Sequence, residues 1–147
     1  MTSYWVRPAR PTDLKGVREL ARRVRREFHV AVRGQEASSS GRPGELMWVV
    51  EAGRGEIVGC CGVRESGDGT WELHSLFLAP EWRGFGLGRS LVERALRSVQ
   101  DAGAVALACA VPAEFAEAAG LLGSLGFVEG QAAGGQRRFV RNVGLVS

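Results

Sequence analysis

A chain of 147 residues with 45% apolar and 24% charged side chains has the size and composition of one globular domain, which we expect to span residues 1–147. Its longest apolar runs fall well short of the roughly 20 residues of a membrane span, so no membrane partner is expected. The N-terminal segment has no apolar stretch of signal-peptide length, which predicts a cytoplasmic protein.

The charge is distributed unevenly along the chain. Residues 1–42 carry ten basic and four acidic side chains, whereas residues 43–147 carry nine and twelve. A basic end of this kind indicates an anionic partner, which could be a nucleic acid, a phosphorylated cofactor or an acidic substrate. Charge alone does not choose among them.

The cysteines predict buried thiols rather than a metal site. Cys60, Cys61 and Cys109 are an odd number, with no CxxC spacing and no nearby pair of histidines. Cys60 and Cys61 are adjacent, so in a strand they would point to opposite faces. We therefore expect no metal cofactor.

The first third of the chain predicts a strand, a helix and a loop. Tyr4–Ala9 is typical of a short strand closed by prolines. Apolar side chains then recur at helical spacing from Leu14 to Phe28, with Thr12 as the N-cap. The arginines of this helix lie mostly off the apolar face, so a solvated face is favoured over a nucleic-acid surface. Residues 30–44 lose the periodicity and fill with Ser, Gly and Pro, which predicts a long loop.

The remaining two thirds alternate strands with helices. A hairpin and a third strand come first, and two helices separated by an apolar strand follow. Two short strands end the chain. The predicted strands are Leu46–Glu51, Glu56–Arg64, Thr70–Leu78, Ala104–Val111, Phe127–Glu129 and Arg138–Val143, and the predicted helices run from Leu87 to about Gly103 and from Pro112 to Leu125. This order predicts an α/β (α+β) protein with a mixed sheet covered by helices.

Three glycines stand at every second position, Gly84, Gly86 and Gly88, between the third of these strands and a helix. The first amides of a helix have no partner within the helix, and the helix dipole adds partial positive charge there. Glycines let the backbone approach an anion closely, so this turn predicts an anion site. The spacing fits neither GxxxxGK[ST] nor the dinucleotide fingerprint GxGxxG.

The ordered set of features resembles the GNAT superfamily of N-acetyltransferases. The segment Arg83–Gly88 matches the acetyl-coenzyme A loop of that family, R/Q-x-x-G-x-G/A, and "LLGSLGF" at Leu121–Phe127 resembles its closing helix. The resemblance covers nearly the whole chain. It implies a GNAT fold with about six to seven strands and about four helices, in which the fourth and fifth strands splay apart.

The same resemblance implies acetyl-coenzyme A as a co-substrate and assigns the residues that bind it. The pantetheine arm would lie against the strand backbone, and the loop amides would surround the pyrophosphate. These positions are Leu76, Phe77 and Leu78 in the strand, and Arg83, Gly84, Phe85, Gly86, Leu87, Gly88 and Arg89 in the loop.

Acetyl transfer to an amine needs a base, because the acceptor ammonium must lose a proton near neutral pH. Glu72 and His74 are two residues apart and share one face of the predicted strand, opposite Trp71, Leu73 and Ser75. Family members often carry a base in this part of this strand. We expect Glu72 or His74 to act as the base or to position a water, and the sequence does not rank them.

The sequence departs from the family at the acid that protonates the coenzyme A sulfur. Many relatives have a tyrosine where this chain has Leu122, and the only tyrosine here is Tyr4. Either the thiolate leaves without a protein acid, or Ser124, Cys109 or water donates the proton, or catalysis has been lost.

The sequence therefore predicts transfer of an acetyl group from acetyl-coenzyme A to a primary amine of a small molecule or protein, by direct attack on the thioester. A catalytically silent acetyl-coenzyme A-binding or interaction module is the alternative. The arginine-rich first region favours an acceptor with a carboxylate or phosphate over a polyamine. The oligomeric state is left open, with a homodimer as one option.

Overall fold

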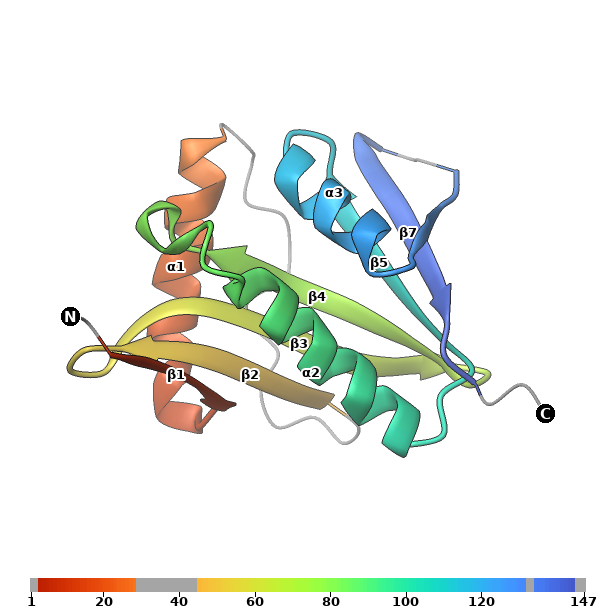
Figure 1. Cartoon of the computed structure of the whole chain (residues 1–147), viewed down its shortest axis with the longest axis horizontal. Helices are drawn as coiled ribbons and strands as arrows, with labels where there is room; N and C mark the ends of the chain where they lie inside the picture. The colour runs from red at the N-terminus through yellow and green to blue at the C-terminus, as the bar shows by residue number, and fades with distance from the viewer. Residues whose placement is uncertain (1–2, 29–44, 132–133, 145–147) are drawn as a thin grey trace.

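The computed structural model describes residues 3–28, 45–131 and 134–144. They build one seven-stranded mixed sheet of order β1-β2-β3-β4-β5-β7-β6, in which β4 and β5 are parallel (Figure 1). The elements are β1 (Tyr4–Pro8), η1 (Pro11–Asp13), α1 (Leu14–Glu27), β2 (Glu45–Ala52), β3 (Glu56–Gly67), β4 (Thr70–Leu78), η2 (Pro80–Trp82), α2 (Leu87–Asp101), β5 (Ala106–Pro112), α3 (Ala116–Ser124), β6 (Val128–Glu129) and β7 (Gln136–Asn142).

The predicted mixed sheet and its strand order along the chain are confirmed, and the helix count differs slightly. The described residues hold three α-helices, where about four were expected. The expected fourth came from the resemblance alone, because the apolar periodicity supports only three helical segments. The predicted loop over 30–44 lies outside the described residues.

The two longer helices cover opposite faces of the sheet, with α1 behind it and α2 in front (Figure 1). Each buries the apolar stripe that its sequence predicts, including Val17, Leu20 and Val24 of α1 and Leu91 and Val92 of α2. Burying a side chain of this kind contributes about 1.5–3 kcal/mol. No helix in the described part of the chain is long and apolar enough to span a membrane.

The first and last helices, α1 and α3, each begin at a different residue from the one predicted. Thr12 is not the N-cap of α1, because it lies inside the 3-10 turn η1, and Asp13 stands at the helix start instead. The Asp13 carboxylate accepts hydrogen bonds from the Arg7 guanidinium and the Arg10 amide. Pro112 ends β5 rather than opening α3, which begins only at Ala116.

Strand β4 contains a bulge and leaves its parallel neighbour part-way along its length. Its pairing with β5 begins at Thr70 and ends at Leu73 opposite Cys109, although β4 continues to Leu78. The predicted splay is therefore present. On the other side, Ser75 has a φ of 54° where the register with β3 shifts, so two residues of β4 face one of β3.

Candidate active site

A pocket of about 280 Å³ opens where β4 separates from β5. Nearly all the predicted cofactor residues border it, namely Leu76, Phe77, Leu78, Arg83, Gly84, Gly86, Leu87, Gly88 and Arg89. The exception is Phe85, a residue that is 62% exposed and packs its ring against Trp82 instead. Apolar walls from α1 and α3 complete the pocket. Sequence reasoning missed these walls, which include Val24, Phe28 and Phe115, because helical periodicity marks them only as core.

The glycine loop has a backbone that other residues rarely adopt. Gly84 and Gly86 have φ values of 86° and 78°, and a Cβ at either position would meet nothing within 4 Å. Glycine is therefore needed at these two positions for its backbone conformation and not for lack of space. Gly86 is the N-cap of α2, so the amides of Leu87, Gly88 and Arg89 open the helix without helical partners. These amides border the pocket and make its mouth attractive to an anion.

Gly88 is needed for a different reason. A Cβ there would lie 3.1 Å from Cδ2 of Leu121, so the glycine allows α2 and α3 to approach closely. At the far side of this contact, the Arg89 guanidinium donates a hydrogen bond to Ser124 Oγ at 3.0 Å, and Ser124 Oγ donates to the Leu121 carbonyl. The start of α2 is thus held against the end of α3.

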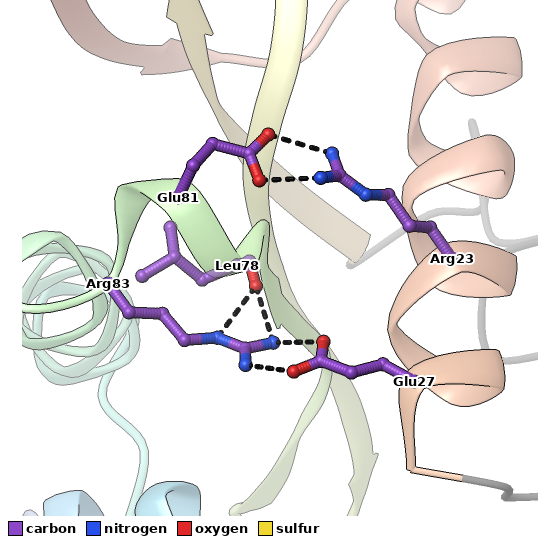
Figure 2. A network of polar contacts seen from close by, with 5 residues as sticks. All are labelled: Arg23, Glu27, Leu78, Glu81 and Arg83. Atoms are coloured by element: carbon purple, nitrogen blue, oxygen red, sulfur yellow. Dashed lines mark hydrogen bonds and ion pairs between the residues drawn. The ribbon is translucent and has the colours of Figure 1, made fainter.

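Arg83, the first residue of the loop motif, joins three parts of the pocket wall (Figure 2). Its guanidinium makes a bidentate ion pair with Glu27 at the end of α1, at 2.6 and 2.9 Å, and donates twice to the Leu78 carbonyl. It also lies over the ring of Phe28. A second ion pair, between Arg23 and Glu81, links α1 to η2 nearby.

The two predicted bases differ in their surroundings. Glu72 is partly exposed, and its carboxylate lies 3.3 Å from the Arg138 guanidinium of β7. His74 is buried, and burial lowers its pKa to about 4, with a smaller contribution from Arg64. His74 is therefore neutral at pH 7, and it binds a proton less readily than a solvated imidazole does.

The prediction for Ser75 is wrong, and two further residues of the site were missed. Strand alternation places Ser75 on the face opposite His74, but the bulge turns it, and Ser75 Oγ lies 3.0 Å from His74 Nδ1. Glu45 of β2 lies with Oε1 3.7 Å from His74 Nε2. Gly62 of β3 leaves room for the imidazole, because a Cβ there would lie 2.6 Å from Cε1. A lone acidic residue and a lone glycine at strand positions carry no sequence signal for such contacts.

The structure also bears on the alternative acids. Leu122 is fully buried in α3, and Tyr4 packs its ring against Trp82 on β1's side of the sheet. Burial raises the pKa of the Cys109 thiol to about 12, which makes it a weaker acid than the coenzyme A thiol. The three cysteines are free and buried, as predicted. Within the described ranges, no group of three or more His, Cys, Asp and Glu side chains is placed to hold a metal ion.

Comparison with known proteins decides the family. The family model described as "Acetyltransferase (GNAT) family" matches residues 14–127 of this sequence. The chain belongs to the acetyltransferase (GNAT) family. The matched region includes the pocket, the glycine loop and both predicted bases. No curated protein sequence matches this GNAT chain.

Solved structures share the GNAT fold over nearly the full length. A GNAT-family acetyltransferase from Staphylococcus aureus Mu50 superposes with a TM-score of 0.87 at 14% identity, covering 96% of this chain and 99% of that one. The ribosomal-protein-S18-alanine N-acetyltransferase of Escherichia coli gives 0.76 at 20% identity, covering 99% and 97%. Spermidine N-acetyltransferase from Vibrio cholerae, solved with coenzyme A and spermine, gives 0.70 at 20% identity, covering 95% of each chain.

Proposed function

We propose that this GNAT chain transfers the acetyl group of acetyl-coenzyme A to a primary amine by direct attack of the amine on the thioester. The observation that carries the proposal is the pocket at the splayed end of β4, with the amides of the glycine loop at its mouth. The acceptor is a small molecule or a protein. Bound acetyl-coenzyme A would supply the activated thioester, and the chain would supply binding, orientation and the base.

The pyrophosphate is assigned to the amides from Gly84 to Arg89, and the pantetheine arm to the backbone of β4. Two features support this. The loop leaves several amides without helical partners, and in the part of the chain that the structure describes no strand runs parallel to β4 beyond Leu73. Because the Leu78 carbonyl already accepts from Arg83, Leu76 and Phe77 are the first candidates to contact the pantetheine amides.

A matched pair of variants tests the donor site. Gly86→Asn and Gly86→Asp have the same size, and both side chains tolerate positive φ better than most. Only aspartate adds a negative charge where we place the pyrophosphate. We expect coenzyme A to bind to Gly86→Asp at least tenfold more weakly than to Gly86→Asn by calorimetry. Equal dissociation constants would contradict the assignment.

His74 is proposed as the group that takes the proton, with Glu72 second. His74 is neutral at pH 7 and lies where β4 leaves β5, whereas the Glu72 carboxylate is occupied by Arg138. The measurement is the pH profile of kcat/KM for His74→Gln, Glu72→Gln and the double variant. An unchanged profile in the double variant would remove both residues from the chemistry.

An acceptor that carries an anionic group is favoured by the charges beside Glu72. Arg64 is its cross-strand neighbour in β3, and the exposed Arg138 pairs with it from β7. Thiol release from acetyl-coenzyme A, measured over amines that include glutamate, aspartate, phosphoethanolamine and spermidine, tests this. Preference for spermidine would overturn the choice of an anionic acceptor.

One observation favours a catalytically silent module as the second candidate. A buried leucine, Leu122, stands where relatives carry the acid tyrosine, and Cys109 is too weak an acid to replace it. Such a module would bind coenzyme A and release no thiol above the rate of spontaneous hydrolysis. The same acceptor screen therefore separates the two functions.

A further inference from the structure

Three polar side chains meet on the face of the sheet that α1 covers, next to the point where β4 and β5 separate. The imidazole of His74 lies in the middle. Its Nδ1 is 3.0 Å from Ser75 Oγ, and its Nε2 is 3.7 Å from Glu45 Oε1. The three residues come from β2 and from the bulged part of β4, and together they form a Ser75-His74-Glu45 array.

The array is buried and incompletely satisfied. The side chains of His74 and Glu45 are 7% and 4% exposed. Neither carboxylate oxygen of Glu45, nor Nε2 of His74, has a hydrogen-bond partner among the residues that the structure describes. A buried carboxylate without a protein partner is costly, so such a group commonly serves a ligand, a water or a reaction. Catalytic hydrogen bonds are often long without substrate and shorten in the reacting complex.

The chemistry of the two neighbours selects one tautomer of the imidazole. When Glu45 accepts a hydrogen bond from the imidazole in the reacting complex, the ring nitrogen that faces it must carry the proton. Nε2 is then the donor, and the lone pair is on Nδ1. A hydroxyl can donate to that lone pair while it accepts a proton from another group. Ser75 Oγ is therefore placed to pass a proton to Nδ1.

The bulge is what makes the array possible. In a regular strand, neighbouring side chains point to opposite faces, so Ser75 and His74 could not touch in this way. The φ of 54° at Ser75 turns the hydroxyl towards the imidazole, at a strain that residues other than glycine seldom accept. The opposing glycine of β3, Gly62, lets the ring lie flat against the sheet and reach towards β2.

The other charges on this face come from four elements. They are Arg64 of β3, Glu72 of β4, Arg138 of β7 and Arg25 of α1, which stacks on Phe77. Arg64 disfavours a positive charge on the imidazole. The Glu45 carboxylate is the group placed to offset that effect when the imidazole becomes charged.

We propose that Ser75, His74 and Glu45 form a proton relay for the acetyl transfer, a role that rests on the function proposed above. As the amine nitrogen bonds to the acetyl carbon, its proton moves to Ser75 Oγ and the hydroxyl proton moves to His74 Nδ1. The carbon–sulfur bond breaks and its electron pair leaves on the coenzyme A sulfur. The proton held on His74 then returns along the relay to the thiolate. In this relay Ser75, the residue before the pocket-lining Leu76, would meet the substrate, and Glu45 is a positioning residue.

Two variants and one conservative change test the relay. Their kinetics are measured with an acceptor amine that the wild-type protein acetylates. Ser75→Gly removes the hydroxyl and tolerates the positive φ, and we expect kcat to fall at least tenfold. Glu45→Gln keeps the size, and we expect kcat to fall about tenfold and the acid limb of the kcat/KM profile to move down by about one pH unit. Glu45→Asp restores part of the loss. The affinity for coenzyme A stays within twofold in all three.

The matched controls are Ser98→Ala on α2 and Glu65→Gln on β3, which lie outside the array and should keep the wild-type kcat. Nitrogen NMR of the imidazole, assigned by comparison with His74→Gln, should show the proton on Nε2. Unchanged kcat and pH profile in Ser75→Gly or in Glu45→Gln, or a proton on Nδ1, overturns the relay alone. If the wild-type protein binds coenzyme A but acetylates none of the amines, the proposed function and the relay fail together.

Discussion

His74 lies almost out of solvent between β2 and the bulge of β4, and burial lowers its pKa from 6.5 to about 4. The unfolded chain therefore binds a proton at higher pH than the folded one. Stability from this group is fully present above pH 6.5 and is lost as the pH falls towards 4, by at most about 3 kcal/mol. Denaturant unfolding at several pH values should show this loss, and His74→Gln should flatten it. An equal slope in both proteins would contradict the assignment.

Gly62 sets the position of the same imidazole. A methyl group there would lie 2.6 Å from Cε1 and 2.7 Å from Nε2 of His74, so Gly62→Ala must displace the ring. We expect a loss of about 1–3 kcal/mol in the free energy of unfolding. We also expect a fall in kcat with little change in coenzyme A affinity.

Gly120→Ala is the control for that substitution, because a Cβ at Gly120 in α3 meets nothing within 4 Å. It should be neutral or stabilising by up to about 1 kcal/mol. Thermal melts and steady-state kinetics of the two variants make the comparison. A Gly62→Ala protein with wild-type stability and kcat would show that the His74 imidazole can adopt another position without cost.

At the residue scale, the sequence predicts those features that the spacing of residues encodes. Gly84, Gly86 and the pair Glu72 and His74 follow from turn chemistry and strand period. The position of Ser75 cannot be predicted in this way, because a bulge shifts the period by one residue and the segment "ELHSLF" contains no signal for a bulge. The role of Glu45 cannot be predicted for another reason, since its contact with His74 joins strands that are not neighbours in the sheet.

At the scale of elements, two ion pairs that differ in solvent exposure connect α1 to the segment after β4. The pair of Arg83 and Glu27 is about a quarter exposed and also holds the Leu78 carbonyl, whereas Arg23 and Glu81 are both about half exposed (Figure 2). A bidentate guanidinium is not replaced by an ammonium, and exposed pairs contribute below about 1 kcal/mol.

Arg83→Lys should therefore loosen the pocket wall, and Arg23→Lys should not. We expect the dissociation constant of coenzyme A to rise about tenfold for Arg83→Lys, equivalent to about 1.4 kcal/mol. It should stay within twofold for Arg23→Lys, which is the matched control. Calorimetry measures both. Equal effects would show that Arg83 does not support the pocket.

Element types are predictable here and element ends are less so. Apolar periodicity marks α1, α2 and the β4 core because packing selects those residues. The N-terminus of α1 is set instead by the ion pair between Asp13 and Arg7, which joins residues of a turn and a strand. The late start of α3 likewise follows from the length of β5, whose last residue Pro112 pairs with Gln136 of β7.

At the scale of the whole molecule, the sheet consists of two parts joined by a short seam. One part is β1 to β4 with α1 and α2, and the other is β5 to β7 with α3 (Figure 1). The seam is the parallel pairing of Thr70–Leu73 with Ala106–Cys109. The pocket lies at the open end of this seam and is lined from both parts. A ligand there touches both and should stabilise them against each other.

Coenzyme A should accordingly raise the stability of both parts together. At a concentration 100 times its dissociation constant, a ligand adds about 2.7 kcal/mol, and for a protein of this size each kcal/mol shifts Tm by roughly 3 °C. A shift of about 8 °C is expected in thermal melts. Hydrogen exchange should slow in the last residues of β4, in the first turn of α2 and in α3, while the β2–β3 hairpin shows only the global change. Protection confined to the glycine loop would mean that the ligand binds there without bridging the seam.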